Sequence, residues 1–196
     1  MKLNKRLILA SSSPRRQHLL RQLGLEFEIR TSGVDEESNG SDDPVEHVRT
    51  LSFQKAEAAA RQVPTGIVIG ADTIVVLDGH ILGKPKNPEN AVDMLQRLSG
   101  RTHEVFTGFT LYDRPSDRSV TEVERTMVTF RALSLPEIRA YVATGSPMDK
   151  AGAYGIQDDF GAIFVESIQG CFYNVVGFPL TKFYLSLQQF LKNLEV

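Results

Sequence analysis

Apolar positions along the chain follow two spacings, one typical of strands and one typical of helices. Short consecutive or alternating apolar runs predict strands at residues 7–9, 27–32, 103–113 and 119–130, and a strand with a hairpin over 66–82. Apolar residues three and four apart, together with capping residues, predict helices starting at Pro14, Pro44, Pro88, Ser134 and Leu180. We interpret residues 151–177 as loop and strands.

The order of these elements predicts the fold class. Strands and helices alternate at first and a meander follows, which is typical of a mixed α/β (α+β) fold with a mixed sheet. Within residues 66–82 we expect a break at Gly-Ala-Asp-Thr, 70–73, and a hairpin turn at Asp78-Gly79. We expect one domain over residues 1–196, either undivided or formed of two lobes around a cleft.

The first strand leads directly into a helix start through a serine-rich turn. Ser13 stands as the N-cap and Pro14 at the first helical position. The unpaired N–H groups of this turn, the helix dipole and the serine hydroxyls suit an anion, and Arg15 and Arg16 add guanidinium groups that suit phosphate. An ordinary strand-to-helix turn with two solvated arginines fits the same residues.

Composition and charge narrow the class of protein. The chain is 41% hydrophobic and 23% charged, and its single cysteine, Cys171, excludes an internal disulfide. We expect no leader, no membrane span and a cytoplasmic location. The net charge of -2 argues against nucleic-acid binding, but residues 1–30 are mainly basic and residues 31–50 mainly acidic. That asymmetry fits a site for a small polyanion with a divalent cation, and it also fits random charge patterning.

Asp72 is the residue that the pattern favours most for chemistry. It follows the buried run GIVIGA, and we expect it at a strand end, where an acid can hold a cation or activate water. A turn aspartate that caps its own backbone is the alternative. Thr73 either reaches a ligand or pairs across strands, and Lys55 and Lys84 either bind phosphate or are solvated.

Other site chemistries fail on inspection. The chain contains neither GxxxxGK[ST] nor GxGxxG, which excludes a P-loop and a dinucleotide fingerprint. The four histidines have no metal-ligand spacing, and we interpret His103 as a structural or hydrogen-bonding residue. Cys171 has no nearby histidine or helix start in the sequence that would make it a nucleophile.

Six motifs in order carry a resemblance to a known family. They are SSSPRR, GADT, GKP, SGRTHEVFTG, MDKAGAYGIQ and NVVGFPL, spread over residues 11–180. Together they resemble the Maf family of nucleoside triphosphate pyrophosphatases. The resemblance implies an elongated mixed sheet flanked by helices with a deep cleft, similar to the inosine triphosphatase fold. It also implies hydrolysis of a nucleoside triphosphate to the monophosphate and pyrophosphate, a divalent cation (Mg²⁺ or Mn²⁺) and a homodimer.

The segment DKAGAYGIQ resembles the dTTP and UTP branch of that family. The resemblance implies that Asp72 is the general base and that Glu36 and Asp72 bind the metal. It assigns substrate choice to Arg15, Thr73 and Gln157, and the other polar contacts of the cleft to Ser13, Arg16, Lys55 and Lys84. The chain departs from the family after Gln157, where Asp158-Asp159-Phe160 stand in place of the usual glycine.

The main interpretation is therefore an enzyme that removes dTTP, UTP or base-modified uridine triphosphates from the nucleotide pool. Two alternatives remain open: a 7-methyl-GTP pyrophosphatase, and a binding protein that inhibits septum formation in cell division. A nucleic-acid-binding module is disfavoured by the net charge and by the lack of an aromatic and basic platform.

Overall fold

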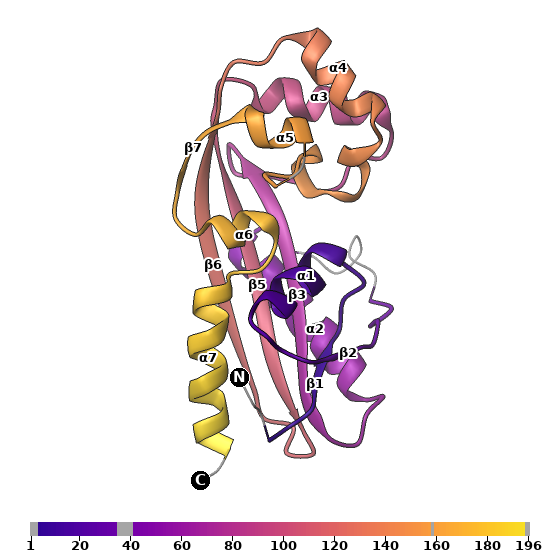
Figure 1. Cartoon of the computed structure of the whole chain (residues 1–196), viewed down its shortest axis with the longest axis vertical. Helices are drawn as coiled ribbons and strands as arrows, with labels where there is room; N and C mark the ends of the chain where they lie inside the picture. The colour runs from indigo at the N-terminus through magenta and orange to yellow at the C-terminus, as the bar shows by residue number, and fades with distance from the viewer. Residues whose placement is uncertain (1–3, 35–40, 158, 195–196) are drawn as a thin grey trace. The chain divides into compact units, whose positions relative to one another are not determined.

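The structure is a computed structural model that describes residues 4–34, 41–157 and 159–194. Among these residues the strands form one seven-stranded sheet in the order β2-β1-β3-β5-β6-β7, with β4 paired to β3 (Figure 1). The strands are β1 (Leu7–Leu9), β2 (Glu28–Ile29), β3 (Gly66–Leu77), β4 (His80–Leu82), β5 (Thr102–Arg114), β6 (Ser119–Phe130) and β7 (Val165–Gln169). Parallel and antiparallel pairs both occur, which confirms the mixed sheet.

The helices are α1 (Pro14–Gln22), α2 (Pro44–Ala60), α3 (Pro88–Leu98), α4 (Leu135–Ala143), α5 (Asp159–Phe164), α6 (Phe172–Val176) and α7 (Leu180–Leu194), with short 3-10 turns at Ser146–Asp149 and Ala151–Ala153. Of these, α1, α2, α3, α4 and α7 begin where the sequence predicts, whereas α5 and α6 lie in the segment interpreted as loop and strands. Ser13, Asp43, Asn87 and Ser134 each accept a backbone N–H at the start of a helix, and a proline follows within the first turn.

The chain divides into two compact units, each built from segments that are distant in sequence. Unit 1 consists of Met1–Asp72, Thr107–Glu124 and Gly177–Val196, and unit 2 consists of Thr73–Phe106 and Arg125–Val176. The strands β3, β5 and β6 each contribute residues to both units.

Unit 1 contains the parallel part of the sheet. β1 pairs with β2 on one side and with β3 on the other, where Leu9 is in register with Ile69. The apolar face of α7 packs in the core of this unit. There Phe183 of α7 contacts Phe109 of β5 and Phe178, and the three ring centroids lie 4.9 to 5.8 Å apart. The apolar pattern from Leu180 onward therefore does mark a helix that packs on a core.

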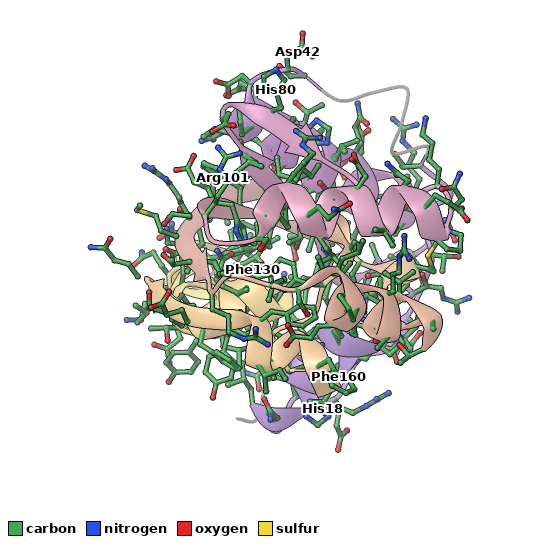
Figure 2. All side chains as sticks on the ribbon, turned by 90° about the horizontal axis from the view of Figure 1, so that it is seen from above. His18, Asp42, His80, Arg101, Phe130 and Phe160 are labelled. Atoms are coloured by element: carbon green, nitrogen blue, oxygen red, sulfur yellow. The ribbon has the colours of Figure 1, made fainter. Side chains whose placement is uncertain are left out.

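The core of unit 2 contains a buried aromatic cluster. Phe130, labelled in Figure 2, is 1% exposed and packs edge-on against the rings of His103, Tyr154 and Phe164. Phe160, also labelled there, lies on α5 and is exposed. The cluster joins β5 and β6 to the segment that precedes α5.

Three details of the sequence interpretation are wrong. β3 runs unbroken from Gly66 to Leu77, so Asp72 lies inside a strand and not at its end. Residues 172–176, interpreted as part of a strand, form α6, and the strand expected at 27–32 is reduced to the two residues of β2. Gly70 has no side chain because α2 packs closely on it, not because the strand ends there.

Candidate functional site

The centre of the candidate site in unit 1 is a buried ion pair between Lys55 and Asp72. Lys55 Nζ donates to Asp72 Oδ1 at 2.7 Å, and the two residues are 4% and 5% exposed. Asp72 Oδ2 is buried as well and accepts no hydrogen bond from the described residues. A buried carboxylate oxygen without a donor is costly, so this atom is suited to accept from a water or to bind a cation.

Two glycines bring Lys55 to Asp72. A Cβ at Gly70 would lie 2.1 Å from the carbonyl oxygen of Ser52, and a Cβ at Gly108 would lie 2.3 Å from that of Val48. Any side chain at these positions would push α2 away from β3 and β5. The close approach of the helix therefore depends on both glycines, and it sets how far Lys55 reaches over the sheet.

The serine-rich turn lies at the same end of the parallel strands as Asp72. The N–H of Ala10 donates to the carbonyl of Ile69 at 2.8 Å, and β1 and β3 run in the same direction beyond that point. Ser13 caps α1 by accepting the N–H of Arg16 at 3.5 Å. The carboxyl end of parallel strands followed by a helix N-terminus is a usual place for an anionic ligand.

Arg16 is held by neutral protein groups. Its Nε donates to the carbonyl of Gly177 at 3.1 Å, and its Nη1 donates to Ser11 Oγ at 3.3 Å. Arg16 thus ties the turn before α1 to the start of the last segment of unit 1. Arg15 is half-buried on the same helix turn.

Unit 2 carries the remaining candidates that the structure describes. Thr73 follows Asp72 in β3 and is half-buried, Lys84 is exposed after β4, and Gln157 is exposed at the end of a buried segment. Gly83, beside Lys84, accepts the N–H of Gly152 at 3.0 Å. The loop that carries Lys84 and the segment that carries Gln157 are therefore joined.

His103 has the structural role that the sequence suggested. Its Nε2 and the hydroxyl of Tyr154 are 2.8 Å apart, and His103 is 1% exposed. Burial lowers the pKa of His103 to about 4 and raises the pKa of Tyr154 far above its ordinary value. Both side chains are consequently neutral near pH 7.

Of the two metal ligands that the resemblance implies, the structure describes Asp72. Glu36 and Asp158 lie outside the described residues. Among residues that the structure does describe, no group of three or more His, Cys, Asp and Glu is placed to hold an ion. Asp72 Oδ2 nevertheless fits one ligand position, because it is an anionic oxygen without a protein donor.

Several residues that shape the site were not singled out from the sequence. Gly70, Gly108 and Gly177 act through close packing or a backbone carbonyl, which no side-chain pattern shows. Lys150 is buried, and its Nζ donates to the carbonyl of Ser146 at 2.5 Å and to Asp149 Oδ1 at 2.8 Å. Its place in the motif MDKAGAYGIQ was the only available signal.

Comparison with known proteins covers nearly the whole chain. The family described as Maf-like protein matches residues 6–190. A protein of Pelotomaculum thermopropionicum named dTTP/UTP pyrophosphatase is 48% identical over 95% of this chain and 97% of its own. Proteins of the same name from Salinibacter ruber and Bacillus cereus are 50% and 49% identical, over 93% and 98% of this chain and 89% and 92% of theirs.

Among solved structures, that of the Staphylococcus aureus Ham1 protein matches 64% of this chain and 72% of its own, with a TM-score of 0.48 and 16% identity. That likeness is partial, and nothing about function follows from it. In the described part of the chain no helix has the length and apolar character needed to span a membrane. The family match and the relatives at about half identity agree, and this chain belongs to the Maf family.

Proposed function

We propose that this chain is a nucleoside triphosphate pyrophosphatase that hydrolyses dTTP and UTP to the monophosphate and pyrophosphate, and base-modified uridine triphosphates with them. The name shared by relatives that are 48 to 50% identical over nearly the whole chain supports the substrate class. The observation that supports the chemistry is the buried carboxylate of Asp72, which has one oxygen held by Lys55 and the other without a donor among the described residues.

In the proposed reaction Asp72 is the general base. The oxygen of a water molecule attacks the α-phosphorus and its proton passes to Asp72 Oδ2. The bond between the α-phosphorus and the bridging oxygen breaks, and its electron pair leaves with pyrophosphate. Lys55 holds Oδ1, so that Oδ2 is the oxygen that remains to take the proton.

Positive groups of unit 1 would bind the phosphate chain. The start of α1 at Ser13 and the guanidinium of Arg15 offer donors to phosphate oxygens, and the exposed Lys84 adds a further positive charge. A bound Mg²⁺ or Mn²⁺ would neutralise phosphate charge, with Glu36 as a protein ligand. Asp72 Oδ2 is its second candidate ligand, as an alternative to the role of proton acceptor. We further propose that Thr73, Arg15 and Gln157 select the base. The homodimer rests on the family resemblance alone. The cation rests on that resemblance, on the charge asymmetry of residues 1–50 and on Asp72 Oδ2, and the cytoplasmic location is an expectation from the sequence.

A panel of triphosphates tests this proposal. We expect kcat/KM for dTTP and UTP to exceed that for dCTP, dGTP and 7-methyl-GTP by at least about tenfold, with monophosphate and pyrophosphate as products and with EDTA abolishing turnover. In ¹⁸O-labelled water the label should appear in the monophosphate. A preference for 7-methyl-GTP, or release of inorganic phosphate as the first product, would overturn the proposal. Light scattering of the purified protein tests the homodimer separately.

A further inference from the structure

Residues 152–156 are consecutively buried, and they end at the exposed Gln157. The backbone of Gly152 and of Ala153 is left-handed, with φ of 67° and 61°. This region is unfavourable for alanine because of its Cβ, so the conformation persists only where the surroundings hold it. Ala153 lies four residues before the candidate specificity residue Gln157, so the contacts that hold this conformation also bear on Gln157.

Three backbone N–H groups hold part of the segment, and that of Ala153 donates to the carbonyl of Lys150 at 3.1 Å. The N–H of Gly152 donates to the carbonyl of Gly83 at 3.0 Å, and the N–H of Gly155 donates to the hydroxyl of Tyr141 at 3.3 Å. A Cβ at Gly152 would lie 2.9 Å from Val75, so only glycine fits there without displacement. These contacts fix residues 152 and 155 but leave the side chain between them to be held by something else.

That side chain is Tyr154, and His103 holds it. The hydroxyl of Tyr154 lies 2.8 Å from His103 Nε2, and the two rings meet edge to face with centroids 5.3 Å apart. Phe130 packs against both rings, at 4.9 Å from His103 and 4.7 Å from Tyr154. His103 belongs to β5, whereas Tyr154 stands only three residues before Gln157.

We propose that His103 is a positioning residue for base selection: through its hydrogen bond to Tyr154 it holds residues 152–157 so that Gln157 presents its amide in one fixed place. The inference rests on the proposed function. A uracil edge offers carbonyl acceptors and an N3–H donor, which a glutamine amide can match only in a fixed orientation. A cytosine edge has the reverse pattern, so discrimination between UTP and CTP measures how well the amide is held.

A purely structural role for His103 leads to a different expectation. If the bond only stabilises unit 2, its loss should lower the stability of the protein and affect every triphosphate equally. If it positions Gln157, its loss should act on KM and on the UTP to CTP ratio, while kcat stays close to that of the wild type because Asp72 and Lys55 belong to unit 1.

Tyr154→Phe is the informative variant, because it removes the hydroxyl and keeps the ring against Phe130. Ser99→Ala is the matched control: Ser99 Oγ accepts the N–H of Leu133 at 2.7 Å, also in unit 2 but outside the segment. For Tyr154→Phe we expect the ratio of kcat/KM for UTP over CTP to fall about tenfold, mostly through a higher KM for UTP, and kcat to change by less than about twofold. Ser99→Ala should keep the wild-type ratio.

Amide hydrogen exchange supplies a readout that is independent of turnover. In Tyr154→Phe the amides of residues 152–157 should exchange at least about fivefold faster than in the wild type, and in Ser99→Ala they should not. Unchanged exchange in Tyr154→Phe, or faster exchange with an unchanged UTP to CTP ratio, overturns the inference. If the wild-type enzyme does not prefer UTP to CTP, the proposed function itself is wrong. The assay of the wild type tests that outcome separately from the variants.

Discussion

Lys55 and Asp72 form an ion pair in a buried position, so the loss of the Asp72 charge removes a carboxylate that compensates the buried ammonium of Lys55. We expect Asp72→Asn to lower the free energy of unfolding by about 3–5 kcal/mol and to lower turnover by at least about a hundredfold. The double variant Lys55→Met/Asp72→Asn removes both charges of the pair, so most of the stability should return while turnover stays lost. Urea unfolding and steady-state kinetics measure the two quantities.

The double variant separates a catalytic role of Asp72 from a structural one. Recovery of both stability and turnover would mean that the ion pair only supports the fold. Near wild-type turnover in a folded Asp72→Asn variant would remove Asp72 as the base, and with it the proposed reaction.

Arg16 is half-buried and Lys84 is exposed, so their loss should have different effects on stability. Arg16 donates to Gly177 and Ser11, and Arg16→Ala should therefore cost about 1–3 kcal/mol of stability along with activity. Lys84 is exposed, and Lys84→Ala should change stability by no more than about 0.5 kcal/mol while lowering kcat/KM by about one to three orders of magnitude.

Thermal unfolding and kinetics on both variants check this contrast, and Arg16→Lys serves as the control for charge. Lysine retains the positive charge but cannot make both bonds of the guanidinium. If Arg16→Lys has wild-type stability, the bonds to Gly177 and Ser11 contribute nothing to the fold.

His103 makes the stability of the protein sensitive to acid. Its pKa is lowered from 6.5 to about 4 by burial, so the unfolded chain binds the proton more readily than the folded one. Stability from this residue is complete above the unfolded pKa and is lost as the pH falls toward the folded pKa. We expect about 2 kcal/mol to be lost between pH 7 and pH 5.

Denaturant unfolding of the wild type and of His103→Gln at both pH values isolates this contribution, because all other titrating groups are shared. The variant should be less stable at pH 7 but should lose about 2 kcal/mol less on acidification. Equal losses in the two proteins would mean that His103 does not carry the effect.

At the scale of elements, the position of α2 is the feature on which the buried ion pair depends. Gly108→Ala would place a Cβ 2.3 Å from the carbonyl oxygen of Val48, and the helix has to move to accept it. We expect a stability loss of about 1–3 kcal/mol and a more than tenfold loss of turnover, because Lys55 moves with the helix. Phe183→Leu, on the buried face of α7 in the core of unit 1, is the control with a similar stability cost and near wild-type turnover.

The elements that the sequence predicted well are those with local signals. The N-caps at Ser13, Asp43 and Ser134 each mark a helix start, because a capping side chain acts within its own turn. The failures have non-local causes. Residues 172–176 are rich in Phe, Tyr and Val, which favour strands, yet they form a helix in which Asn174 donates to the carbonyl of Val105 and to Thr126 Oγ1. The break predicted before Asp72 also fails for a non-local reason, because Gly70 accommodates α2, which is distant in sequence.

For the molecule as a whole, the sequence predicted the mixed sheet and the family, but not how the chain is partitioned. Asp72 and Thr73 are neighbours in β3 and yet fall in different units, and no composition change marks that boundary. The pairing of Lys55 with Asp72 could not be predicted either, since it depends on α2 packing on Gly70 and Gly108, which are distant in sequence from Lys55. The motifs identify the candidate residues, but their contacts depend on the tertiary structure.

The division of the chain has a consequence for how the protein is made. A ribosome releases β1 before any residue of unit 2 and α7 after all of them, and both elements belong to unit 1. The nascent chain therefore contains all of unit 2 before Phe178 and Phe183, the aromatic partners of Phe109, have been synthesised. Until α7 has left the ribosome, the apolar surface of unit 1 stays exposed to water and to chaperones.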